Sequence, residues 1–180
     1  MGSSVEEAVV RKSVRVRASV ERAWSVFVEQ METWWPATHH IAAAGFELIV
    51  VEPRAGGRWY ERDAEGRQCE WGKVLGWDPP RSVRFSWQVG PKPGSEEWGY
   101  DPDMSRASEV EFRFSEDSDG VTLVELEHSK LERHGMGAEK LRALFEGPGA
   151  WVDILAQYVR VVDAGVRGAA DSGEAAEEGA

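Results

Sequence analysis

The chain has 180 residues, a formal net charge of −11 and nine tryptophans. This length fits one domain with a single core. The acidic balance disfavours nucleic acid as a partner, since affinity for phosphates depends on Lys and Arg. No apolar run reaches the about 20 residues of a membrane span, so we expect no membrane association. The N-terminus lacks an apolar signal segment, and Cys69 has no second cysteine to pair with. Both features favour a cytoplasmic protein.

The N-terminal part predicts a strand and then a helix. Apolar and polar residues alternate from Ser13 to Ala18, as in a half-buried strand. Ser19 is a suitable N-cap, and apolar residues follow at helical spacing as far as about Glu32. Pro36 then prevents further helix, because the residue before a proline is disfavoured in the α region.

Six further strands are expected, at residues 46–52, 57–62, 68–77, 81–89, 108–115 and 121–130. Turn signals rich in Asp, Gly and Pro separate several of them. A connection at residues 90–107 exceeds the about 12–15 residues usual for a loop without structure. Because it carries Trp98 and Tyr100, we expect it to form a lid or a surface for a partner.

The C-terminal part predicts two helices and a tail. The first helix covers residues 138–145 and ends at Gly147, and Pro148 suits the first turn of the second. The second helix carries an apolar stripe of Trp151, Ile154, Leu155, Tyr158, Val159 and Val162. The order of strand, helices, six strands and helix predicts an α+β domain.

A set of short motifs runs along residues 12–163. Among them are Trp34-Trp35-Pro36, Gly56-Gly57-Arg58, Trp71-Gly72-Lys73-Val74, Trp77-Asp78-Pro79-Pro80-Arg81, Phe85-Ser86-Trp87 and Leu126-Glu127-His128. In these motifs the chain resembles the SRPBCC superfamily, also called START-like or birch-pollen-allergen-like. Within it, the chain looks most like the bacterial proteins grouped with the C-terminal domain of the activator of the heat-shock protein 90 ATPase.

This resemblance implies the helix-grip fold, a seven-stranded curved antiparallel sheet wrapped around a long C-terminal helix, with two short helices after the first strand. It also implies a cavity between sheet and helix that holds apolar small molecules in many relatives. The chain then divides into an N-terminal extension (residues 1–11), the helix-grip domain (12–164) and a disordered acidic tail (165–180). Members include binders, polyketide cyclases and co-chaperones, so function has to be argued from the site.

Two ionisable residues are expected on the inward face of the sheet. Glu61 shares a strand face with Trp59, and a carboxylate there is costly unless it is hydrogen-bonded or paired. His128 shares a face with Leu126 and titrates near neutrality. The alternatives are that Glu61 lies in water or pairs with an arginine, and that His128 is an ordinary core residue.

The other candidates are apolar and belong to the expected cavity. With the two ionisable residues, the predicted ligand-binding set is Trp34, Trp35, Trp59, Glu61, Trp71, Phe85, Trp87, Phe112, His128, Trp151 and Leu155. Core packing is the alternative for each apolar member. His39 and His40 belong to no metal-binding motif, and we expect neither a metal nor a cofactor.

The leading interpretation is non-catalytic binding of a small hydrophobic or amphipathic molecule. One alternative is a cyclase-, aromatase- or hydrolase-type enzyme with Glu61 and His128 as an acid and base pair. Another is a chaperone-associated interaction module that works through the outer sheet face or residues 90–107. An exposed Trp98 would favour a homodimer.

Overall fold

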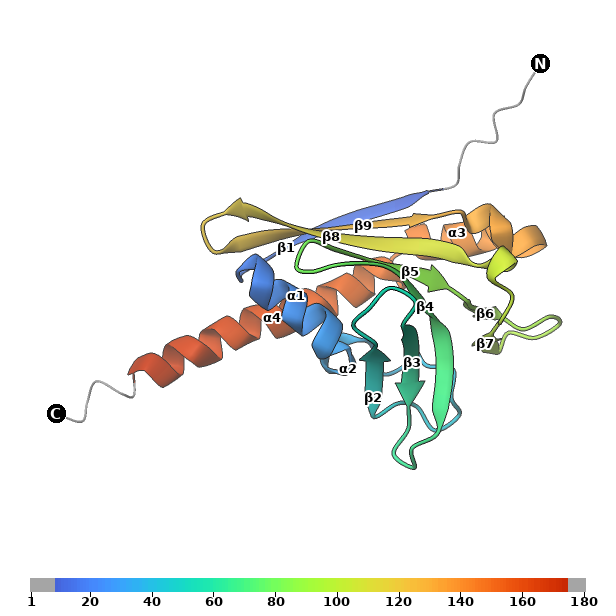
Figure 1. Cartoon of the computed structure of the whole chain (residues 1–180), viewed down its shortest axis with the longest axis horizontal. Helices are drawn as coiled ribbons and strands as arrows, with labels where there is room; N and C mark the ends of the chain where they lie inside the picture. The colour runs from blue at the N-terminus through green and yellow to red at the C-terminus, as the bar shows by residue number, and fades with distance from the viewer. Residues whose placement is uncertain (1–8, 175–180) are drawn as a thin grey trace, which may run out of the picture.

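The computed structural model describes residues 9–174, and side chains at residues 9–135 and 137–165. Its elements are β1 (Val10–Val16), α1 (Val20–Glu29), α2 (Met31–Trp34), β2 (Leu48–Val51), β3 (Arg58–Arg62), β4 (Gln68–Asp78), β5 (Ser82–Trp87), β6 (Val89–Pro91), β7 (Trp98–Tyr100), η1 (Met104–Arg106), β8 (Ser108–Ser118), β9 (Val121–Ser129), η2 (Leu131–Gly137), α3 (Ala138–Glu146) and α4 (Trp151–Glu174). A seven-stranded antiparallel sheet has the order β1-β9-β8-β5-β4-β3-β2, and β6 and β7 form a hairpin. Helix α4 runs along the sheet (Figure 1), and the predicted helix-grip architecture is confirmed.

The first strand and helix form where local sequence signals place them. β1 pairs with β9 from Val10 to Val16, so it begins somewhat earlier than the alternating pattern predicted. The prediction for Ser19 is confirmed, because its hydroxyl oxygen accepts a hydrogen bond from the backbone N–H of Arg22 at 3.2 Å. α2 ends just before Pro36, as expected.

Several details differ from the predictions. The strand expected at 81–89 is split into β5 and β6, and the connection at residues 90–107 contains β7 and η1, for which no element was predicted. α4 begins at Trp151, so Pro148 lies in the preceding turn and not in the first helical turn. Helix α4 reaches Glu174, within the predicted tail, and residues 1–8 and 175–180 lie outside the described residues.

One face of the sheet carries an aromatic core. Alternate residues of β8 and β9 are buried, as strand periodicity requires. Phe27 of α1 packs on Phe112 with ring centroids 4.5 Å apart, and Trp59 packs on Phe85 at 4.4 Å. The Tyr158 hydroxyl donates a 2.6 Å hydrogen bond to a backbone carbonyl of α1, which fixes α4 against that helix.

A close approach between two strands requires the glycine at position 72. Gly72 lies opposite Trp59, where the register of β3 and β4 shifts. A Cβ atom at Gly72 would overlap the backbone carbonyl oxygen of Ser86 on β5. At Gly76, on the same strand, an added Cβ would meet only the Arg84 Cβ at 3.5 Å, an ordinary contact.

We therefore expect Gly72→Ala to lower the free energy of unfolding by about 2–3 kcal/mol, because overpacking forces backbone to move. Gly76→Ala is the matched control and should change it by less than about 0.5 kcal/mol. Urea unfolding of both variants measures the difference. Equal stability of the two variants would contradict the close approach.

Candidate functional site

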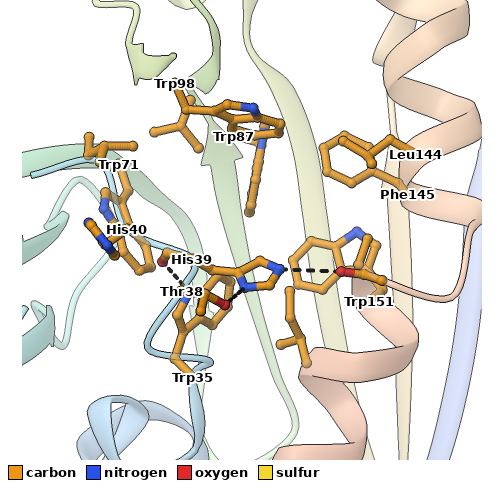
Figure 2. A pocket seen from close by; sticks show the side chains of 15 residues that line it. Trp35, Thr38, His39, His40, Trp71, Trp87, Trp98, Leu144, Phe145 and Trp151 are labelled. Carbon is orange, nitrogen blue, oxygen red and sulfur yellow. Dashed lines mark hydrogen bonds between the residues drawn. The ribbon is translucent and has the colours of Figure 1, made fainter. Parts of the chain in front are cut away.

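The candidate site is a cavity of about 370 Å³ beside the start of α4, here called the tryptophan cavity. Figure 2 shows Trp71 and His40 on one side of it and Trp151 and Phe145 on the other. Its lining residues are Trp35, Thr38, His39, His40, Ile41, Trp71, Trp87, Val89, Trp98, Leu144, Phe145, Gly149, Ala150, Trp151 and Ile154. Five tryptophans and three polar side chains in this set make the cavity largely apolar, as small-molecule sites usually are.

Four of the five indole rings of the cavity, those of Trp35, Trp71, Trp87 and Trp151, hold one another in place. Trp35 and Trp71 have ring centroids 5.0 Å apart, and Trp87 and Trp151 have centroids 5.3 Å apart. Trp35 also meets Trp151 edge to face at 6.1 Å, which joins the two pairs. Tilted and edge contacts at these separations are favourable. The walls are therefore large, flat apolar surfaces with little freedom to collapse inward.

Histidine side chains close one side of the cavity. The indole N–H of Trp35 donates to the His39 carbonyl at 2.9 Å, and the His39 Nε2 lies 3.3 Å from the Gly149 carbonyl. Since a carbonyl only accepts, this Nε2 carries the proton. The contact joins the segment after α2 to the turn before α4.

Glu61 is fully buried behind the cavity and does not line it. Its Oε1 accepts hydrogen bonds from the backbone N–H of Ile41 at 2.7 Å and of Ala42 at 3.2 Å. The same oxygen accepts the indole N–H of Trp71 at 2.9 Å. Oε2 has no partner among the described residues. The carboxylate therefore holds two parts of the wall, Ile41 and Trp71, in a fixed relation.

His128 is also fully buried, and both of its ring nitrogens are engaged. Nδ1 accepts the indole N–H of Trp151 at 3.1 Å, and Nε2 lies 2.8 Å from the Ser108 hydroxyl. Burial, with a smaller contribution from His134, lowers the pKa of His128 to about 3. The ring is therefore neutral near pH 7 and acts as an acceptor for a residue of the cavity wall.

The two ionisable candidates are not brought together. Glu61 is on β3 and His128 is on β9, with three strands between them in the sheet. Neither lines the tryptophan cavity, and their hydrogen bonds go to protein groups. The geometry does not assemble the acid and base pair that the enzyme alternative requires. Glu61 also differs from the alternative of an exposed or arginine-paired carboxylate, because its partners are N–H groups of the wall.

The remaining predicted residues divide into two groups. Four of them line the cavity, and five lie in the core. Those in the lining are Trp35, Trp71, Trp87 and Trp151. Those in the core are Trp34, Trp59, Phe85, Phe112 and Leu155. The buried indole N–H of Trp34 donates to the Val26 carbonyl at 3.0 Å, which is a structural use of the ring.

Sequence reasoning missed much of the polar side of the cavity. Thr38, His39 and His40 lie in irregular chain, where no periodicity indicates a direction, and the two histidines were considered only as metal ligands. Leu144 and Phe145 lie on α3, which was predicted as a helix without a role in the cavity. The available signal was the position of these histidines directly after the Trp-Trp-Pro motif.

Two further properties concern the described part of the chain, residues 9–174. In that part, the described side chains (residues 9–135 and 137–165) include no three from His, Cys, Asp or Glu that come close enough together to hold a metal ion. Its helices include none with the length and apolar content needed to cross a bilayer.

The sheet wrapped around α4 and the aromatic cavity beside that helix define a protein of the SRPBCC superfamily. Residues 17–160 match the family described as Activator of Hsp90 ATPase homolog 1-like protein, and the chain belongs to this family. A comparison with curated proteins finds no match.

Solved structures with the same fold include two with substantial sequence identity. An anthrahydroquino-gamma-pyrone synthase, Txn09, complexed with SUM, is 39% identical, with a TM-score of 0.60 over 86% of this chain and 96% of that one. CalC, a self-sacrificing resistance protein from Micromonospora echinospora, is 30% identical, with a TM-score of 0.63 over 86% and 94%. Protein NE0264 from Nitrosomonas europaea, 16% identical with a TM-score of 0.59 over 86% and 93%, shares the fold.

Removal of the Glu61 carboxylate should loosen the wall of the cavity. Glu61→Leu leaves the Ile41, Ala42 and Trp71 N–H groups without their acceptor, and each unmade buried bond costs about 1–3 kcal/mol. We expect the amide hydrogens of Ile41 and Ala42 to exchange at least about tenfold faster. Glu70→Leu is the control, since that carboxylate pairs with Arg58 instead. Unchanged exchange in Glu61→Leu would contradict this role.

Stability should fall on acidification because of His128. In the unfolded chain His128 binds a proton below about pH 6.5, whereas in the folded chain it binds one only below about pH 3. This contribution to stability is therefore present above pH 6.5 and is lost as the pH falls. Between pH 7 and pH 5 it should lower the free energy of unfolding by about 2 kcal/mol.

Urea unfolding at the two pH values measures the loss, and His128→Gln should make it smaller by about 2 kcal/mol. His39→Gln, in a histidine of the cavity lining, should keep the loss. An equal pH slope in wild type and His128→Gln would show that His128 is not the group responsible.

Proposed function

We propose that the protein binds a planar, largely apolar small molecule in the tryptophan cavity. The observation that carries this proposal is a volume of about 370 Å³ walled by five indole rings, within the range usual for ligand sites. Flat indole faces favour a flat aromatic ligand, because offset and edge contacts between rings are worth about 0.5–1.5 kcal/mol beyond the burial of area.

The comparisons support a fused-ring ligand. The name of Txn09, 39% identical to this chain, specifies an anthrahydroquino-gamma-pyrone product, which combines aromatic rings with oxygen substituents. We infer a ligand of the same chemical class, an oxygenated polycyclic aromatic molecule. The lining is consistent with this class, since it is aromatic on several sides and polar on one.

His40 is positioned to recognise a ligand hydroxyl. Its Nδ1 lies 2.5 Å from the Ala42 carbonyl, so this nitrogen carries the proton in the neutral ring. Nε2 is then an acceptor, and no group among the described residues is recorded as bonding to it. A phenolic hydroxyl of the ligand would donate to this nitrogen while its rings lie against Trp71.

A second candidate function is ring-forming catalysis on such a molecule. The imidazole of His40 in the lining of a largely apolar cavity is the specific observation that favours it, because a neutral imidazole can act as a general base. This candidate replaces the predicted pair of Glu61 and His128 with His40. Binding without turnover remains our leading proposal, and we propose no cofactor.

Binding of a protein partner stays a prediction. The description of the family names an activator of the Hsp90 ATPase. A protein partner or a homodimer would use the outer sheet face or residues 90–107. A cytoplasmic location likewise stays a prediction from the sequence.

Titration calorimetry with anthraquinone-2-sulfonate as the probe tests the binding proposal. We expect saturable binding that is weakened about tenfold in Trp98→Ala, because one wall of the cavity is lost. Trp77→Ala is the matched control, since Trp77 is also half-buried but packs against Trp24 outside the cavity lining. An equal loss in both variants, or no binding by the wild type, would count against the tryptophan cavity as the site.

A further inference from the structure

A second cavity adjoins the tryptophan cavity and contains a histidine with no assigned role. This hairpin cavity, of about 940 Å³, lies among the β6–β7 hairpin, η1, η2 and α3, and shares Val89, Trp98 and Leu144 with the tryptophan cavity. His134 of η2 lines it and is half-buried. A proton from solvent can therefore reach this imidazole through the hairpin cavity.

Four side chains connect the two cavities by hydrogen bonds. Trp151 Nε1 lies 3.1 Å from His128 Nδ1, and His128 Nε2 lies 2.8 Å from the Ser108 hydroxyl. The same hydroxyl lies 2.7 Å from His134 Nε2. Trp151 lines the tryptophan cavity, His134 lines the hairpin cavity, and the two groups between them are fully buried.

The indole fixes the direction of every bond in this series. An indole N–H only donates, so His128 Nδ1 must be the acceptor and the His128 proton must be on Nε2. That N–H then donates to the Ser108 oxygen. The Ser108 hydroxyl proton is left to donate to His134 Nε2, which accepts only while His134 is neutral.

A proton added to His134 Nε2 reverses the last bond. The Ser108 oxygen would then face two donors, and no further acceptor for its own proton is recorded among the described residues. If His128 instead turned its proton to Nδ1, that N–H would face the Trp151 N–H. Either arrangement leaves a buried donor unpaired, and the second also removes the acceptor of the Trp151 indole N–H in the cavity wall.

Charged groups line the hairpin cavity together with His134. Asp101, Asp103 and Arg106 line the hairpin cavity from the chain after β7 and from η1, and Lys140 lines it from α3. His128 faces it from β9 through Ser108. Burial lowers the pKa of His134 and Asp101 opposes that shift.

The neighbouring carboxylates stay ionised in the window in which histidines titrate. Hydrogen bonds to Arg106 hold the pKa of Asp101 below its usual value. Hydrogen bonds to Ser105 do the same for the pKa of Asp103.

We propose that His134 is a positioning residue for Trp151: protonation of His134 in the hairpin cavity is transmitted through Ser108 and His128, and releases the indole N–H of Trp151 in the wall of the tryptophan cavity. The protonation state of His134 in the hairpin cavity then controls how firmly the Trp151 indole is held in the wall of the tryptophan cavity. The proposal concerns the wall itself and holds whatever ligand the tryptophan cavity takes.

Nuclear magnetic resonance of the full chain with ¹⁵N-labelled indoles tests this without a ligand. The Trp151 N–H signal, assigned with Trp151→Phe, is followed from pH 8 to pH 5.5 beside the imidazole signals of the four histidines. We expect the Trp151 signal to move with the midpoint of His134, and its exchange with solvent to rise between about twofold and tenfold. The indole signal of Trp77, outside both linings, should not follow that midpoint.

His134→Gln supplies the decisive control. Its side-chain oxygen can accept from Ser108 but does not titrate, so the Trp151 signal should stay at its high-pH position. The proposal would be overturned if the Trp151 signal of the wild type did not change at the His134 midpoint. It would also be overturned if that signal changed with pH equally in His134→Gln. Should that variant not fold, the wild-type midpoints decide, because coincidence with His39 or His40 instead of His134 also overturns it.

Discussion

The hydrogen bond from Trp151 to His128 ties the first residue of α4 to β9, and the aromatic packing depends on where it places the indole. Trp151 contacts five other rings, among them Trp35, Trp87 and Phe112. A ring of this size buried without a partner for its N–H would carry an unsatisfied donor. The neutral His128 supplies the acceptor, and burial maintains that neutrality. The hydrogen bond between Trp151 and His128 thus joins α4 to the sheet and fixes an indole of the cavity wall.

The two buried ionisable candidates, Glu61 and His128, support the wall of the tryptophan cavity and do not line it. Glu61 fixes Ile41 and Trp71 from behind, and His128 fixes Trp151 in the same way. Such groups attract attention in a sequence because ionisable residues on an apolar face are costly unless paired. Here the cost is offset by hydrogen bonds to neighbouring protein groups. A buried ionisable residue near a cavity is therefore evidence for a shaped site before it is evidence for catalysis.

Sequence patterns predicted the fold well because its signals are local. The cap at Ser19 and the alternation along β8 and β9 follow from backbone geometry alone. Alternation also assigned Trp59 and Trp87 to the inward face, but only Trp87 reaches the cavity. The face of a strand on which a side chain lies does not determine whether that side chain reaches the cavity or stays in the core. This depends on the curvature of the sheet and the position of α4. His40 lies in irregular chain, so no period could assign it a direction.

The side chains that line the tryptophan cavity do not fill it. Its indoles are locked against one another, and a rigid ring cannot extend into the space as a longer flexible side chain would. The turn before α4 presents Gly149 and Ala150, which have almost no side chain to fill the space. A Cβ atom at Gly149 would meet nothing within 4 Å. The combination of large rigid rings and minimal side chains therefore leaves a space that the protein's own side chains do not fill.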